Sequence, residues 1–117
     1  MKRDVRVYIE DILESIGKVE EYTRGITKEN FLNNSQIQDA VFRRLEIIGE
    51  AVKKTPQEFK DRYSGIPWKK IAGMRDILIH EYSEVSLGRI WKVAKEDVFD
   101  LRKEVLKIKE DLKKEDV

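Results

Sequence analysis

Residues 4–24, DVRVYIEDILESIGKVEEYTR, carry an apolar side chain at nearly every third or fourth position. The apolar positions that recur with this spacing are Val5, Tyr8, Ile9, Ile12, Leu13, Ile16 and Val19. Because an α-helix turns once every 3.6 residues, this spacing gathers them on one helical face that can be buried. Gly25 follows directly, and glycine readily adopts the left-handed conformation in which helices end. We therefore predict an amphipathic helix over residues 4–24.

A second long helix is predicted over residues 35–54. Ser35 and Gln38 have the spacing of a capping box, in which the two side chains satisfy free backbone groups at a helix start. Apolar residues then recur at helical spacing up to the end of this segment. The preceding residues 25–34 are mostly polar, and we interpret them as a connector.

Two more helices are predicted between residues 55 and 82. Thr55-Pro56 combines a capping residue with a proline suited to the first helical position, so a short helix should open there and end near Tyr63. Pro67 can open the next helix, which should end around residues 80–82. Gly73 lies inside it at a cost of about 1 kcal/mol relative to alanine. We expect this glycine to permit a close approach between helices.

Ser86 is placed to cap a last helix that runs to the charged C-terminal end of the sequence. Its predicted buried positions are Ile90, Ala94, Leu101, Val105, Ile108 and Leu112. No segment alternates polar and apolar residues convincingly enough to predict a strand. The sequence therefore predicts an all-α fold, an antiparallel helical bundle of about four main helices plus a short one, forming a single domain over residues 1–117.

Composition excludes several kinds of site. The 117 residues contain no cysteine and one histidine, which argues against a disulfide framework and against a zinc centre. With 24 Lys+Arg and 23 Asp+Glu the net charge is +1, so any nucleic-acid contact must come from a local cluster or from two copies. The N-terminal residues lack the apolar core of a signal peptide, and no apolar run is long enough to span a membrane. We expect a cytoplasmic protein that does not bind membranes.

The segment 74–82, MRDILIHEY, concentrates the residues that can carry chemistry. Arg75 and His80 are five positions apart, about 140° around a regular helix, so they do not share one face. Two copies of the helix, packed about a two-fold axis, would bring two such sets into one cleft. Asp76 precedes His80 by one helical turn, so its carboxylate can orient the imidazole and favour its protonated form.

Simpler interpretations stand beside these. A histidine near a helix C-terminus often only complements the helix dipole, and Arg75 is more commonly a salt-bridge residue than a phosphate ligand. Tyr82 suits a boundary position with its ring inward and its hydroxyl outward. Trp68 and Trp91 are more typical of a core or interface than of a platform for stacking bases. Spacing alone leaves these alternatives open.

Residues 75–82 fit the Arg-x4-His-x-Tyr motif of the HepT toxins, within the wider HEPN superfamily. Residues 44–51, RLEIIGEA, resemble the second-helix signature of that family, and residues 66–74, IPWKKIAGM, resemble the approach to its catalytic helix. The resemblance covers nearly the whole chain. It implies a HEPN-like bundle that acts as a homodimer and cleaves RNA without a metal or another cofactor.

The resemblance also implies roles for individual residues. His80 would act as general acid or base while the 2′-hydroxyl of the RNA attacks the neighbouring phosphate, and Arg75 would hold that phosphate. Asp76 would position the histidine. Tyr82 would be the tyrosine to which a partner, a minimal nucleotidyltransferase antitoxin of the MntA type, adds AMP.

Basic residues near this helix are candidates for tracking the RNA backbone, and solvation alone is an equally good explanation of them. They are Lys69, Lys70, Arg89 and Lys92. Two other hypotheses remain: a non-catalytic HEPN module that docks a nucleotidyltransferase and binds nucleotide, and a purely structural helical dimer. The structural dimer leaves the coincidence of Arg75, Asp76, His80 and Tyr82 unexplained.

Overall fold

The computed structural model describes residues 4–80 and 86–115, and all regular secondary structure in these ranges is helical. In chain order the helices are α1 (Val5–Thr23), α2 (Lys28–Leu32), α3 (Ser35–Lys54), α4 (Gln57–Arg62), α5 (Trp68–His80), α6 (Leu87–Lys92) and α7 (Val98–Glu115), with a π-helical turn (Val93–Asp97) joining the last two. The predicted all-α fold is confirmed. None of the helices in the described ranges has the length and apolar character needed to cross a membrane.

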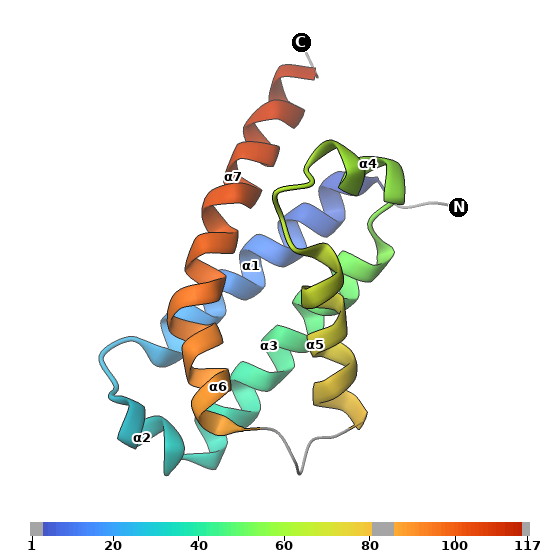
Figure 1. Ribbon diagram of the computed structural model, residues 1–117. Coiled ribbons are helices and arrows are strands. Elements are labelled where there is room, and N and C mark those ends of the chain that lie inside the picture. The colour runs from blue at the N-terminus through green and yellow to red at the C-terminus, as the bar shows by residue number, and fades with distance from the viewer. Residues whose placement is uncertain (1–3, 81–85, 116–117) are drawn as a thin grey trace.

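The long helices pack as antiparallel neighbours. α3 lies against α1 on one side and α5 on the other, while α7 packs on α1. Figure 1 shows α1 and α5 running one way along the bundle and α3 and α7 the other. Each connection between them contains a short helix, α2, α4 or α6, and consecutive long helices run in opposite directions.

One hydrophobic core joins these helices, and the predicted apolar positions supply much of it. From α1, the residues Tyr8, Ile9, Ile12, Ile16 and Val19 are buried, whereas Val5 and Leu13 pack partly exposed at its edge. All six positions predicted for the last helix are buried as well. Gly25 ends α1 in the predicted left-handed conformation, with a φ of 75°.

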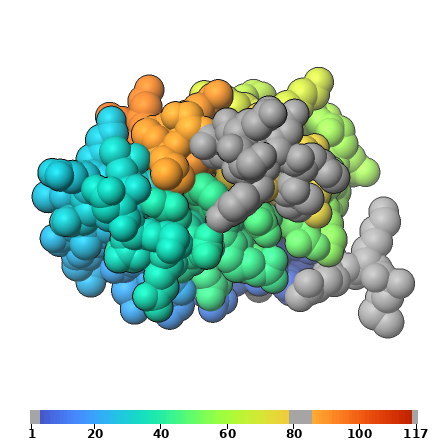
Figure 2. All heavy atoms as spheres, turned by 90° about the horizontal axis from the view of Figure 1, so that it is seen from below, coloured from blue at the N-terminus to red at the C-terminus, as the bar shows by residue number. Residues whose placement is uncertain are grey.

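The predicted connector 25–34 is wrong, because it contains the short helix α2. The Thr27 side chain accepts a hydrogen bond from the Asn30 backbone, and the Asn30 side chain accepts one from the Thr27 backbone. This reciprocal cap stabilises a single turn that buries Phe31 completely. Figure 2 shows α2 and the start of α3 beside α6 at one end of the molecule.

The cap of α3 lies one residue earlier than predicted. Asn34 is the N-cap, and its side-chain oxygen accepts a hydrogen bond from the Ile37 backbone N–H at 3.1 Å. Ser35 is the first helical residue instead. Asparagine and serine cap helices about equally well, so the sequence does not decide between neighbouring candidates.

The start of α4 is also shifted. The Thr55 hydroxyl donates a hydrogen bond to the Ala51 carbonyl of α3, so it closes that helix and does not cap the next one. Pro56 takes the N-cap position without a side-chain hydrogen bond, and α4 begins at Gln57. The predicted short helix exists, with its start one residue later.

Ser86 caps the last helix as predicted, accepting a hydrogen bond from the Arg89 backbone N–H. The π-helical turn within this helix was not predicted. A π turn adds a residue to the helical register, which brings Val98 into the core between Ala94 and Leu101.

Candidate active site

The predicted site residues lie on α5 and just after it. Arg75 and Asp76 are in the second half of the helix, and His80 is its last residue. The His80 side chain and the whole of Tyr82 fall outside the described part of the chain. The proposed roles of His80 and Tyr82 therefore remain predictions.

Gly49 of α3 brings the backbone of α3 into close contact with Arg75 of α5. A Cβ atom added at Gly49 would lie 2.3 Å from the Arg75 Cβ and 3.3 Å from the Ile71 carbonyl oxygen. Only glycine fits this distance without a shift of one helix, so Gly49 fixes where the Arg75 side chain begins. Gly73, by contrast, has open space around it within the described chain, so the close approach predicted there is not seen.

The Asp76 carboxylate forms ion pairs with two basic side chains. Its Oδ1 accepts hydrogen bonds from Lys53 Nζ and from Arg75 Nη1, both at 3.2 Å. The hydrogen bond from Lys53 is the main reason that the pKa of Asp76 lies below its ordinary value. Lys53 follows Gly49 by one turn of α3, so one face of α3 orders both Arg75 and Asp76.

The Arg75 guanidinium is partly shielded, and the residues that the structure describes engage only part of it. A quarter of the side chain is exposed (25%), and its buried Nε makes no hydrogen bond with any described residue. Asp76 accepts from Nη1 alone. Because a guanidinium has five N–H donors, the group retains capacity to bind a phosphate oxygen. The salt-bridge interpretation of Arg75 is confirmed, and it is compatible with phosphate binding.

Two of the four basic residues proposed to contact RNA lie beside other basic residues at the surface. Lys69 and Lys70 are exposed and line an open hollow of about 650 Å³ together with Lys53, Lys60 and one acidic residue, Asp61; we call it the lysine hollow. Partial burial lowers the pKa of Lys60 below its ordinary value. The sequence pattern did not single out Lys53 or Lys60.

The other two basic candidates, Arg89 and Lys92, are exposed on α6 and do not line this hollow. Both remain compatible with solvation alone.

The tryptophans have structural surroundings. Trp68 is buried, and its indole N–H donates to the carbonyl oxygens of Lys60 and Tyr63 at 3.2 and 3.0 Å. Trp91 packs against Phe31, with ring centroids 5.3 Å apart. Trp68 therefore belongs to the core, as predicted, and Trp91 is partly buried and packs against the core. Across residues 4–80 and 86–115, His, Cys, Asp and Glu side chains form no group of three able to hold a metal ion.

Comparison with known proteins shows which family this chain belongs to. The family model described as "Ribonuclease HepT-like" matches residues 12–108. The chain belongs to the HepT-like ribonuclease family.

Relatives in several organisms carry matching names. A protein of Thermococcus cleftensis named "Probable ribonuclease HepT" is 49% identical over 102 residues, which cover 87% of this chain and 93% of that one. A Methanocaldococcus jannaschii protein named as a candidate RNase is 43% identical over 115 residues, covering 98% and 95%.

Another relative is longer. A second Methanocaldococcus jannaschii protein, whose name joins gamma-glutamylcyclotransferase to a candidate RNase, is 52% identical over 114 residues. This chain spans about half of that protein, 51% of its length. No solved structure gives a significant match.

Proposed function

We propose that this chain is a metal-independent endoribonuclease that acts as the toxin of a toxin–antitoxin pair. The observation that supports it most is the fixed position of Arg75, whose backbone is held by Gly49 and whose guanidinium donates to Asp76, a carboxylate that Lys53 also holds. The family and the names of its relatives support an RNase.

In the proposed reaction the RNA supplies its own nucleophile. A ribose 2′-oxygen bonds to the adjacent phosphorus while the bond from phosphorus to the 5′-oxygen breaks, leaving a cyclic phosphate and a 5′-hydroxyl. His80 takes the proton that the 2′-oxygen loses and gives a proton to the leaving 5′-oxygen. Arg75 stabilises the charge that grows on the phosphate oxygens. Asp76 aligns Arg75, and we propose that it also orients His80.

We propose that the working unit is a homodimer packed across α5. Ile77 exposes 44% of its surface, and Gly73, one turn earlier, leaves open space beside the helix. An exposed isoleucine beside a glycine suits a close helix–helix contact. Such a contact would place two copies of Arg75 and His80 around one cleft.

The lysine hollow gives the substrate a path from this cleft. Lys53 donates to Asp76, and Lys60, Lys69 and Lys70 line the same hollow as Lys53. These ammonium groups suit successive phosphates of an RNA strand. We propose that the RNA backbone crosses this hollow.

Regulation is proposed to act at Tyr82. An MntA-like nucleotidyltransferase antitoxin would attach AMP to its hydroxyl, and the added phosphates would compete with RNA for Arg75 and His80. In a strain that co-expresses the antitoxin, Tyr82→Phe is then expected to remain toxic. AMP found by mass spectrometry on a different residue would contradict this assignment.

Growth on expression tests the proposal in cells. The wild-type chain should arrest growth of a host that lacks the antitoxin, whereas Arg75→Ala and His80→Ala should not, at equal protein levels and with unchanged circular dichroism. Equal toxicity of all three proteins would refute the catalytic assignment. Absence of toxicity from unmodified wild type would favour a non-catalytic module that docks a nucleotidyltransferase.

A further inference from the structure

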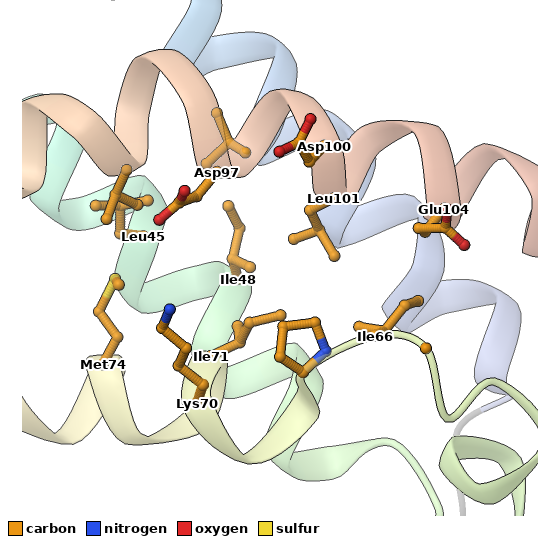
Figure 3. Close-up of a pocket in the computed structure, with 14 residues that line it drawn as sticks. Leu45, Ile48, Ile66, Lys70, Ile71, Met74, Asp97, Asp100, Leu101 and Glu104 are labelled. Carbon is orange, nitrogen blue, oxygen red and sulfur yellow. The ribbon is translucent and has the colours of Figure 1, made fainter.

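A second surface, which borders the lysine hollow and shares Ile66, Pro67 and Lys70 with it, has the shape of a docking groove. It lies between α5 and α7 with α3 beneath it and encloses about 250 Å³ (Figure 3). α5 packs on α3 and α7 packs on α1, so the two helices flank the groove without extensive contact between them. Its apolar lining is supplied by Leu45, Ile48, Ile66, Ile71, Met74, Val93, Val98 and Leu101.

The charged residues of the groove are unequally divided. The π-helical turn and α7 contribute Asp97, Asp100 and Glu104, whereas α5 contributes only Lys70. Figure 3 shows Lys70 and Asp97 extending into the space between the helices. Asp97 and Asp100 form no ion pair with any described residue, while Glu104 pairs with Lys107 at 3.2 Å. The wall formed by the π-helical turn and α7 is therefore acidic, and two of its carboxylates have no ion-pair partner among the residues that the structure describes.

This charge distribution decides which occupant fits. Phosphates of RNA would be repelled by the acidic wall, so the groove is not a continuation of the RNA path. Asp97, Asp100 and Glu104 stand at positions i, i+3 and i+7, which spreads them over about 10 Å along one helical face. An incoming helix can match them with lysine or arginine at similar spacing and place its own apolar stripe on the floor.

We propose that the groove between α5 and α7 docks a basic amphipathic helical segment of a partner protein. The apolar lining receives the leucine-like side chains of that segment, and the carboxylates of the π-helical turn and α7 hold its cations. Lys53, Lys60 and Lys69 do not line this groove, so docking here leaves them uncovered, whereas Lys70 lines both surfaces.

A labelled model peptide tests this proposal without RNA, so its outcome is independent of the proposed ribonuclease activity. The probe is a fluorescent peptide of about 18 residues with leucine on one helical face and lysine on the other. It should bind the wild-type chain in about 0.15 M salt. Methyl NMR shifts should concentrate at Ile48, Ile71 and Leu101. A peptide with glutamate in place of lysine should not bind.

Charge variants locate the binding site. Asp97→Asn with Asp100→Asn should weaken binding of the lysine peptide by about five- to tenfold, as expected for two partly exposed ion pairs. The matched control, Glu14→Gln with Glu29→Gln, removes the same charge from exposed positions on α1 and α2 and should leave the affinity unchanged.

Three results would overturn the proposal. The first is absence of binding, and the second is equal weakening by the two double variants, which would show non-specific attraction. The third is concentration-dependent self-association of the chain that Asp97→Asn with Asp100→Asn abolishes, which would assign the groove to a second copy.

Discussion

Gly49→Ala tests how the bundle positions its candidate catalytic arginine. The added Cβ would lie 2.3 Å from the Arg75 Cβ, so the two atoms must separate by about 1 Å or more to reach ordinary contact. Both atoms are close to backbone, and no flexible side-chain end can absorb the shift. α5 must therefore move away from α3 and carry Arg75 with it.

The expected effects on stability and on activity differ. Overpacking costs about 1–3 kcal/mol, but alanine gains back about 1 kcal/mol over glycine within a helix. The free energy of unfolding should thus fall by no more than about 2 kcal/mol. A displacement of about 1 Å at a reacting centre can lower the rate roughly a hundredfold. We expect RNA cleavage by Gly49→Ala to fall by about ten- to a hundredfold in a protein that remains folded.

Gly17→Ala is the matched control. Gly17 lies within α1, and an added Cβ would meet nothing within 4 Å. This variant should gain up to about 1 kcal/mol and keep its activity. Urea denaturation measures the stability of both variants, and cleavage of a labelled RNA measures their rates. Full activity in folded Gly49→Ala would refute the positioning argument.

Three further predictions follow from individual contacts. Lys53→Met should raise the pKa of Asp76 towards its ordinary 3.8, measured by carboxyl NMR titration, and lower cleavage severalfold; an unchanged pKa would show that the ion pair is absent in solution. Gly73→Gln should keep the fold but weaken the proposed dimer and cleavage, and sedimentation showing an intact dimer would move that interface elsewhere. Burial and the hydrogen bond to Asp111 (3.0 Å) raise the pKa of Tyr63 above 10.0, so the neutral phenol stabilises the fold below pH 10.0 and this contribution disappears as pH rises through the folded-state pKa. Urea titrations at pH of about 9 and about 11 should therefore show a smaller alkaline loss in Tyr63→Phe than in wild type, and equal losses would contradict the pKa direction.

The parts of the fold that were predictable are those encoded locally. Helical periodicity identified the buried face of α1 and of the last helix, because burial repeats with the turn of the helix itself. α2 was missed since only Phe31 anchors it, and a single buried residue has no period. The π-helical turn was missed because a gap in an apolar stripe does not reveal a change of helical register.

The candidate site was predictable only in part. The motif on α5 identified Arg75 and Asp76, but their neighbours come from α3. Lys53 and Asp76 are 23 positions apart, and no local pattern links them. Gly49 carries a local signal, because it is a glycine inside a helix. Gly73 carries the same signal, but the described chain makes no close contact there.

Cleavage of RNA by purified protein in EDTA tests the central claim most directly, with wild type beside His80→Ala and Arg75→Ala. Intact mass should first establish that the wild-type protein carries no AMP. The account predicts that wild type cleaves without a metal ion, leaving a cyclic phosphate, while both variants lose nearly all activity. Cleavage that persists in His80→Ala, or that appears only when a divalent metal is added, would contradict it.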